Sequence, residues 1–238
     1  MNRRRLPVFL ALLVAAAGSI GCSAGGGDGK AQVWVTRDQG ATTLERGTVP
    51  AGLTALQGLD RLTKIETSYG GAFVTAINGL STSRLRQRDW FYFVNGYESD
   101  RGAASYRLRA GDVEWWDYRA WRGRERFPVV VGAFPEPFLH GYDGKRRLVA
   151  VRYQPGLRTE ALALARVVRA GSVAPLGAPV AVAANLLVVS AGRPGLVAGL
   201  RSGERAGDPV RFVVSGKDFA RALAGNPELA RYRYQAAP

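Results

Sequence analysis

Apolar and polar residues alternate along the first part of the chain in a way that predicts a strand pair followed by a helix. Residues 32–37 alternate as a half-buried strand does, and residues 42–49 can return antiparallel to it. Leucines then recur every three residues within 55–62, so one face of a helix there can be buried. Thr54 stands immediately before this segment, where threonine is a preferred N-cap.

Glycine and asparagine residues mark the turns that separate a second set of predicted strands. Residues 64–69 and 72–77 flank Gly70-Gly71, which is a hairpin signal, and the polar segment 81–88 is predicted to be a loop. Residues 90–94 alternate again and are followed by Asn95-Gly96, a pair that tolerates the positive φ angles of a tight hairpin turn. With a further strand at 113–118, the order of elements indicates an α+β module.

The second half of the chain has a different composition, with fewer aromatic residues and more Ala, Val and Leu. The polar segment 122–126 is therefore predicted to be a hinge. Strands are predicted at 127–134, 147–153, 180–190 and 210–215, and helices at 160–169, capped by Thr159, and at 217–224. Strands that alternate with helices favour a small α/β domain with a largely parallel sheet over 127–238.

Residues 89–121 hold four of the five tryptophans. Alternation places Trp90, Tyr92 and Val94 on one face of a strand, and Phe91 and Phe93 on the other. One face should pack on the helix. The other must be covered by the second domain, by a ligand or by a partner, and packing and a ring-stacking platform explain it equally well.

The same region carries a recognisable motif. The pattern W-x-Y-x-V-N-G from Trp90, followed by Y-x-L-x-x-G-D-x-x-x-W-x-Y from Tyr106, resembles the transcobalamin-like C-terminal domain, a β-grasp module. Segments 49–62 and 71–79 fit the helix and the central strand of that family. The resemblance spans 30–121 and implies an N-terminal β-grasp-like domain, which the small α/β domain predicted from the strand and helix pattern then follows.

The resemblance also implies binding rather than catalysis. Cobalamin is a ligand raised by the family alone, because this chain lacks the helical-barrel domain that completes the cobalamin site of the carriers. A site is expected along one edge and one hairpin of the module. Its candidate ligand-binding residues are Tyr69, Phe73, Asn78, Trp90, Tyr92 and Asn95.

The N-terminus has the pattern of an export signal. Three arginines precede a short apolar segment, 6–17, and Ser19-Ile20-Gly21-Cys22 resembles a bacterial lipobox, with Ser where Leu is usual. We therefore expect lipid attachment at Cys22, a tether over 23–29, and a location on the extracytoplasmic face of the cell membrane. The alternative is a plain signal peptide, with Cys22 incidental and the protein secreted.

Charge and composition restrict the chemistry. A formal net charge of +14 suggests anionic partners such as lipid head groups or wall polymers, but the arginines are scattered and nucleic-acid binding is not expected. His140 and Cys22 are the only residues of their types, so neither an imidazole metal site nor a Ser-His-Asp triad is predicted. Asp112 and Glu114 share a strand face, where a turn carboxylate and an Arg partner explain them better than chelation does.

These patterns predict a non-enzymatic lipoprotein without cofactor or metal that binds a small molecule, for example as the binding partner of an importer. The alternative function is an envelope module that docks on a membrane protein or a wall polymer.

Overall fold

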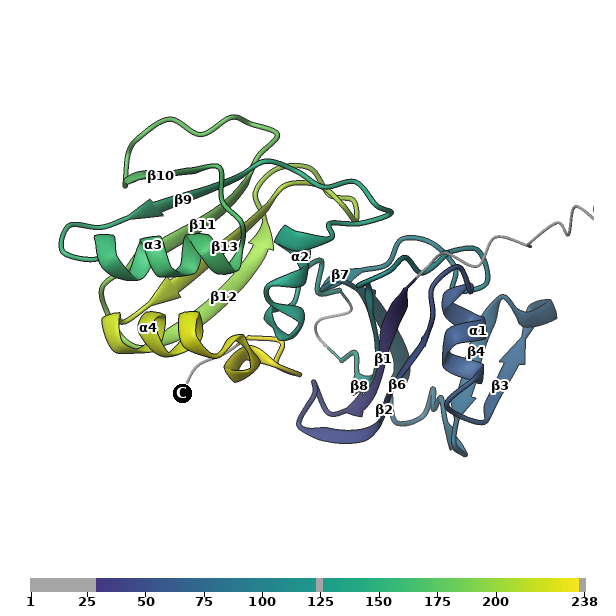
Figure 1. The fold of residues 1–238 in the computed structure, drawn as a ribbon. Helices are drawn as coiled ribbons and strands as arrows, with labels where there is room; N and C mark the ends of the chain where they lie inside the picture. Colours follow the sequence, from purple (N-terminus) through teal and green to yellow (C-terminus); the bar gives the residue numbers. More distant parts are fainter. Residues whose placement is uncertain (1–28, 123–125, 236–238) are drawn as a thin grey trace, which may run out of the picture.

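The computed structural model describes residues 29–122 and 126–235, which form two halves side by side (Figure 1). The predicted export signal and Cys22 lie outside the described residues. The first half contains β1 (Lys30–Arg37), β2 (Thr42–Pro50), α1 (Ala55–Asp60), β3 (Ile65–Ser68), the 3₁₀ turn η1 (Tyr69–Gly71), β4 (Phe73–Ile77), β5 (Leu80–Ser81), β6 (Arg88–Val94), β7 (Tyr97–Glu98) and β8 (Val113–Ala120).

The first half is built on a five-stranded sheet with the order β2-β1-β8-β6-β7. β1 and β8 run parallel in the sheet, whereas β2 pairs antiparallel with β1, as predicted. Thr54 caps α1 as predicted: its hydroxyl accepts from Gln57 N, and the Gln57 side chain accepts from Thr54 N. A separate three-stranded sheet, β3-β4-β5, lies beyond α1 (Figure 1).

The Asn-Gly turn between β6 and β7 is confirmed. Asn95 has φ 50° and Gly96 has φ 82°, so both central residues are left-handed, as a type I′ turn requires. The second Asn-Gly pair, Asn78-Gly79, has nearly the same angles and turns β4 into β5.

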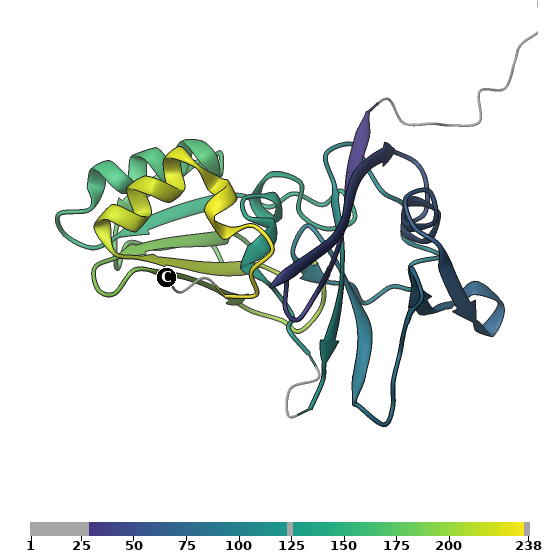
Figure 2. The ribbon, with the colours of Figure 1, turned by 90° about the horizontal axis from the view of Figure 1, so that it is seen from below.

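The second half is an α/β unit whose five-stranded sheet has the order β10-β9-β11-β13-β12. Only β12 is antiparallel to its neighbour, so the prediction of a largely parallel sheet is confirmed. Figure 2 shows α3 and α4 on the same face of this sheet. The elements are η2 (Val131–Ala133), α2 (Glu136–Leu139), β9 (Val149–Tyr153), α3 (Arg158–Val167), β10 (Ser172–Pro175), β11 (Asn185–Ser190), β12 (Gly195–Leu200), β13 (Val210–Ser215), α4 (Lys217–Gly225) and η3 (Pro227–Ala230).

Four details of the second half differ from the prediction. The strand predicted at 180–190 begins only at Asn185, as β11, and residues 180–184 belong to the loop before it. Residues 127–134 form no strand, because Pro128 lacks an N–H to donate and the segment coils into η2. Thr159 lies inside α3 rather than capping it, and the helix follows a turn in which Gly156 has φ 81°. The short edge strands β10 and β12, which are rich in Ser, Pro and Gly, were not predicted.

The aromatic residues of β6 and β8 belong to two different cores. Trp90, Val94 and the β8 residue Trp116 pack with α1 on one face of the sheet. Phe93 and Trp115 pack on the other face against Val130 and Ala133, which belong to the second half, and against Tyr234. The predicted division of faces is confirmed, and the second half, rather than a ligand, covers the second face.

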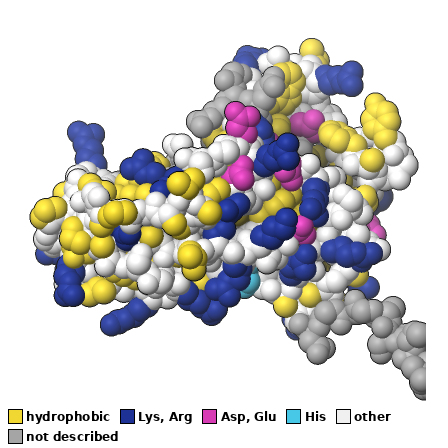
Figure 3. All heavy atoms as spheres, turned by 90° about the horizontal axis from the view of Figure 1, so that it is seen from above, with side chains coloured by type: hydrophobic (Ala, Val, Ile, Leu, Met, Phe, Trp, Pro, Cys, Tyr) yellow, Lys and Arg dark blue, Asp and Glu magenta, His cyan; other side chains and the backbone are white. Residues whose placement is uncertain are grey.

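Basic side chains are spread over both halves, as Figure 3 shows for one face. Within the part of the chain that the structure describes, none of the helices combines the length and apolar character needed to cross a bilayer.

Candidate functional site

Two of the predicted ligand-binding residues are structural groups. Asn95 is fully buried: its Nδ2 donates to Asp112 Oδ1 (2.7 Å) and Gly141 O (2.9 Å), and its Oδ1 accepts from Val113 N (2.8 Å). Trp90 is buried in the core, and its Nε1 donates to Leu80 O at 2.9 Å. Their polar atoms are already paired inside the fold, which leaves neither residue a surface for a ligand.

Two further predicted residues are more exposed. Tyr92 is half-buried and stacks on Trp116 with 4.8 Å between ring centroids, and its hydroxyl bonds to Ser99 and Arg101 O. Asn78 is exposed, and its Oδ1 accepts a hydrogen bond from Lys64 N at 2.9 Å. This bond joins the two chain segments at the open end of the β3–β4 hairpin. Neither lines the cavity that the remaining two residues share.

Tyr69 and Phe73 come together at a cavity of about 350 Å³, here called the aromatic cleft. Their side chains are unusually open for aromatic residues, with Tyr69 84% exposed and Phe73 44% exposed. Trp121, which follows β8, provides a third ring. The lining is completed by Ser68, Thr75, Thr82, Arg84, Arg88 and Asp89.

The local backbone sets the position of Tyr69. Tyr69, Gly70 and Gly71 all have positive φ (51°, 68° and 91°), so the chain between β3 and β4 makes a tight left-handed turn. This conformation costs a tyrosine energy, and Gly70 and Gly71 adopt it without a Cβ clash. The outcome is an aromatic ring held out in solvent above the end of the small sheet.

The charged groups of the aromatic cleft differ in how far they are already engaged. Arg88 is held by Asp38 and Tyr118 O and lies over the Tyr118 ring. Asp89 accepts from Trp90 N at 2.7 Å, and desolvation by burial raises the pKa of its carboxyl. The Arg84 guanidinium has no hydrogen bond or ion pair with any described residue, so it is the cation available to a ligand.

Sequence reasoning missed Arg84, Asp89 and Trp121. They lie on three different segments that adjoin only because β6 pairs with β8 (Asp89 opposite Arg119) and because the small sheet packs beside them. Their positions at strand ends could have identified two of them as candidates. Asp89 lies at the beginning of the Trp90 strand, and Trp121 directly follows the last strand of the aromatic motif.

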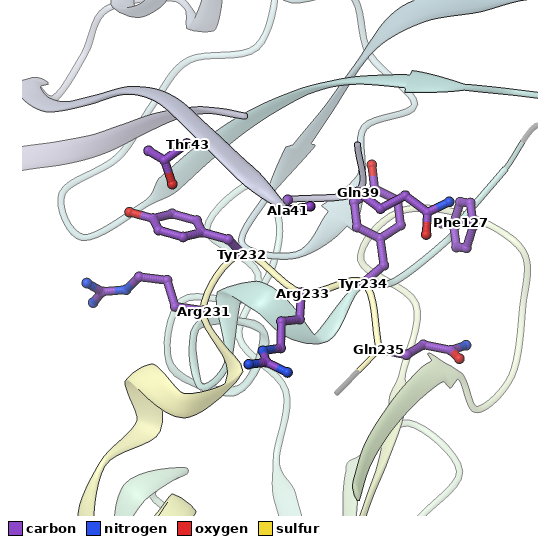
Figure 4. Close-up of a pocket in the computed structure, with 10 residues that line it drawn as sticks. Gln39, Ala41, Thr43, Phe127, Arg231, Tyr232, Arg233, Tyr234 and Gln235 are labelled. Carbon is purple, nitrogen blue, oxygen red and sulfur yellow. The ribbon is translucent and has the colours of Figure 1, made fainter. Parts of the chain in front are cut away.

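A larger cavity of about 750 Å³ lies where the two halves meet (Figure 4). Residues 231–235, here called the strap, run along it from the end of the second half onto the first. In Figure 4 the Tyr232 ring lies toward Thr43 and the Tyr234 ring lies beside Phe127. Gly40 allows this crossing, because a Cβ there would meet Tyr232 O at 1.5 Å.

The strap is held by rings and by one buried carboxylate. Tyr232 packs edge-on to Trp34 (5.0 Å between centroids), and Tyr234 packs edge-on to Trp115 (5.5 Å). The Tyr234 hydroxyl donates to Asp117 Oδ2 at 3.0 Å. Desolvation raises the pKa of Asp117, although hydrogen bonds from Thr36 and from the Gly40 backbone stabilise its charged form. These contacts join the halves rather than form an open binding surface.

The carboxylates considered for chelation have separate structural roles. Asp112 accepts from Arg109 N and from Asn95, which confirms its role in the turn. Glu114 was expected to pair with an arginine, and this is wrong: it is fully buried, accepts from Trp116 Nε1 at 2.5 Å, and makes no ion pair with a described residue. No group of three or more metal-ligating side chains occurs among residues 29–122 and 126–235.

His140 is half-buried and pairs with Glu136, with 2.5 Å between Nδ1 and Oε2. This hydrogen bond raises the pKa of the imidazole above its ordinary value. The ring also packs close against Gly111, where a Cβ would meet His140 Nε2 at 2.4 Å.

Comparison with known proteins gives one family match, which lies in the first half. A family model described as a domain of unknown function, DUF4430, matches residues 52–120. The match covers less than a third of the chain. No curated protein matches.

Two solved structures are similar over less than two fifths of the chain. A putative metal binding protein from Ruminococcus gnavus ATCC 29149 is 14% identical, with a TM-score of 0.30, over 39% of this chain and 98% of that one. Haptocorrin in complex with Cbi is 21% identical, with a TM-score of 0.31, over 37% of this chain. This chain spans only 25% of the haptocorrin chain.

Proposed function

We propose that this chain is a non-catalytic protein that binds a small ring-bearing molecule in the aromatic cleft. The observation that carries the proposal is the exposure of Tyr69 and Phe73 beside a cavity that also holds an unengaged arginine, Arg84. Exposed rings grouped at a cavity are typical of ligand sites, and stacking contributes about 1 kcal/mol per ring pair. The ligand would cover rings that the fold leaves in water.

The polar lining indicates what the ligand carries besides a ring. Arg84 suits a carboxylate or phosphate group, since a guanidinium donates two parallel hydrogen bonds to either. The hydroxyls of Ser68, Thr75 and Thr82 suit amides and hydroxyls at the ligand's edge. Cobalamin is the first compound to test, because the motif around Trp90 raised it. Binding at the cleft does not depend on that choice.

A binding role agrees with the chemistry at the cleft. Asp89 is the only carboxylate among its lining residues, and neither a histidine nor a cysteine lines it. An acid–base pair or an activated nucleophile would need a second group within hydrogen-bond reach.

Equilibrium dialysis of the full chain against cyanocobalamin tests the proposal. We expect saturable binding, weakened about fivefold by Tyr69→Ala and by Phe73→Ala, which corresponds to about 1 kcal/mol for each lost ring contact. Leu85→Ala is the matched control, because Leu85 is almost fully exposed and does not line the cleft. Equal binding by all variants would remove the cleft from consideration. Absence of saturable binding would remove cobalamin, and dialysis would then turn to aromatic carboxylates.

We also propose export and lipid attachment at Cys22, which would place the cleft outside the cell, where an importer partner would meet it. The support is the sequence pattern before Cys22. Mass spectrometry of the amino-terminal peptide decides this: an unmodified Cys22 in the membrane fraction would contradict it.

The alternative function, docking on a wall polymer, would use the same cleft. Open aromatic rings next to three hydroxyl side chains also suit a sugar chain. Co-sedimentation with purified wall glycan, reduced by Tyr69→Ala, in the absence of small-molecule binding would favour this alternative.

A further inference from the structure

A second surface of unusual composition lies in the other half of the molecule. Residues 176–184, here called the apolar loop, connect β10 to β11 and read LGAPVAVAA, without one polar side chain. Leu176 is 50% exposed and Val182 is 76% exposed. Leu148 is 77% exposed and adjoins the end of the loop, because its carbonyl accepts from Asn185 N at 2.8 Å.

The backbone of the apolar loop is paired with arginine side chains from outside the loop. Arg201 donates to three of its carbonyls at 3.1 Å or less, Arg152 donates to two, and Arg147 donates to one. The accepting carbonyls belong to Ala178, Pro179, Val180, Ala181, Ala183 and Ala184. Thus the loop exposes apolar side chains while guanidinium groups satisfy most of its carbonyl oxygens.

This hydrogen bonding affects whether the loop can move from water into an apolar medium. A peptide carbonyl that loses water without gaining a donor costs several kcal/mol in an apolar medium, and this cost usually keeps irregular loops out of lipid. Here the donors are already in place. The side chains of Leu148, Leu176 and Val182 can therefore leave water while most carbonyl oxygens of the loop keep a hydrogen-bond donor.

Basic residues predominate around the apolar loop, and the nearest acidic group is Asp208, which is 3.8 Å from Arg147. Lys145 and Arg146 are exposed and immediately precede Arg147 and Leu148, and residues 161–203 contain no Asp or Glu. Figure 3 shows hydrophobic and basic side chains gathered together over the second half on one face. An apolar tip with a basic rim is complementary to a bilayer surface that carries anionic head groups.

We propose that the apolar loop together with Leu148 is a membrane-contact surface that enters the head-group region of an anionic bilayer. Leu148, Leu176 and Val182 supply the apolar contact, and Lys145 and Arg146 supply the attraction to anionic lipid. This surface is separate from the aromatic cleft and does not require the lipid at Cys22.

A probe placed in the loop tests the proposal. In the full chain with Cys22→Ser, the Val182→Cys variant is labelled with an environment-sensitive fluorophore and mixed with vesicles of phosphatidylcholine and phosphatidylglycerol. We expect a blue shift and a rise in emission. The same label at Leu85→Cys, on an exposed loop of the first half, should not respond. The probe reports its own surroundings, so insertion elsewhere in the chain gives no signal at position 182.

Two sets of variants separate the apolar from the charged contribution. Leu148→Ser with Leu176→Ser should abolish the response at position 182 without unfolding the protein, because both side chains are exposed. Lys145→Gln and Arg146→Gln should each weaken the vesicle interaction about fivefold, and phosphatidylcholine alone should give a much smaller response.

Unchanged emission at position 182 in the presence of anionic vesicles would overturn the proposal, as would an equal response at position 85. A response that appears only with envelope proteins, and not with lipid, would assign the surface to a protein partner and would also overturn it.

Discussion

Glu114 is the residue at which burial and charge conflict most clearly. Its side chain is fully buried beside Gly58, where a Cβ would come within 2.9 Å of Oε2. Oε1 accepts from Trp116, but Oε2 has no hydrogen-bond partner among the described residues. Desolvation therefore raises the pKa of this carboxyl well above its ordinary value of 4.5.

The raised pKa of Glu114 predicts a pH-dependent stability. A folded-state pKa above the unfolded one means that the contribution of this group to the free energy of unfolding is fully present below about pH 4.5 and is lost as the pH rises through the folded pKa. Glu114→Gln keeps the acceptor for Trp116 but does not ionise. We expect the variant to gain stability relative to the wild type as pH rises.

Thermal denaturation of both proteins between pH 4 and pH 8 measures this difference. Asp117→Asn is a useful comparison, since burial raises the pKa of Asp117 as well, but several donors stabilise its charged form. Parallel curves for wild type and Glu114→Gln would show that Glu114 does not titrate differently in the folded state.

At the same scale, the sequence identified Tyr69 and Phe73 as candidate site residues but could not distinguish them from Trp90 and Asn95. In the sequence, all four stand at or next to the predicted ends of strands or at turns. Their difference is tertiary: β8 and Gly141 enclose Asn95, whereas no strand covers the outer side of Tyr69. The local sequence pattern indicates which face of a strand a side chain occupies. Whether that side chain is buried depends on which other segments of the chain pack against the same face.

At the scale of elements, the two Asn-Gly turns have similar backbone angles but different surroundings, so their glycines can be compared directly. Gly79 and Gly96 have φ of 79° and 82°, but a Cβ on Gly79 would meet nothing within 4 Å. A Cβ on Gly96 would lie 2.9 Å from Val130 O and 3.3 Å from Pro137. Gly79→Ala should therefore cost about 1 kcal/mol of stability from backbone strain alone, and Gly96→Ala about 3 kcal/mol.

Chemical denaturation of both variants against the wild type measures these costs. Equal losses would mean that Val130 and Pro137 move aside, and that the junction behind this turn is softer than its packing indicates.

Elements with a strong local signal were predicted well: the capped α1, the alternating β6 and the apolar β13 all follow from the sequence. The missed ones lack such a signal. β12 reads GLVAGL and becomes a strand because β13 offers it a paired edge, and residues 127–134 look like a strand but are used as packing against the first half. The apolar composition of residues 127–134 correctly predicted that they are buried, but the prolines prevent them from forming a strand.

At the scale of the molecule, the strap predicts how strongly the two halves depend on each other. Tyr232→Ala with Tyr234→Ala removes two rings packed on Trp34 and Trp115 and leaves Asp117 without one of its donors. We expect a loss of several kcal/mol, with tryptophan emission shifted to the red as water reaches these indoles. Gln235→Ala, an exposed strap residue, should leave both measurements unchanged.

Tryptophan emission followed through denaturation tests this coupling. Wild-type-like emission in the double variant would show that the first half keeps its second face closed without the tyrosines.

The strap also affects when packing of the first half can be completed during synthesis. Sheet strands at residues 30–120 obtain part of their covering from Tyr234, which is made more than a hundred residues later. Until that tyrosine has emerged from the ribosome, Trp115 and Phe93 lack part of their covering, although Val130 and Ala133 can already pack on them. A nascent chain stalled before Tyr234 would therefore leave one part of this aromatic cluster exposed, where chaperones that recognise apolar surfaces could bind it.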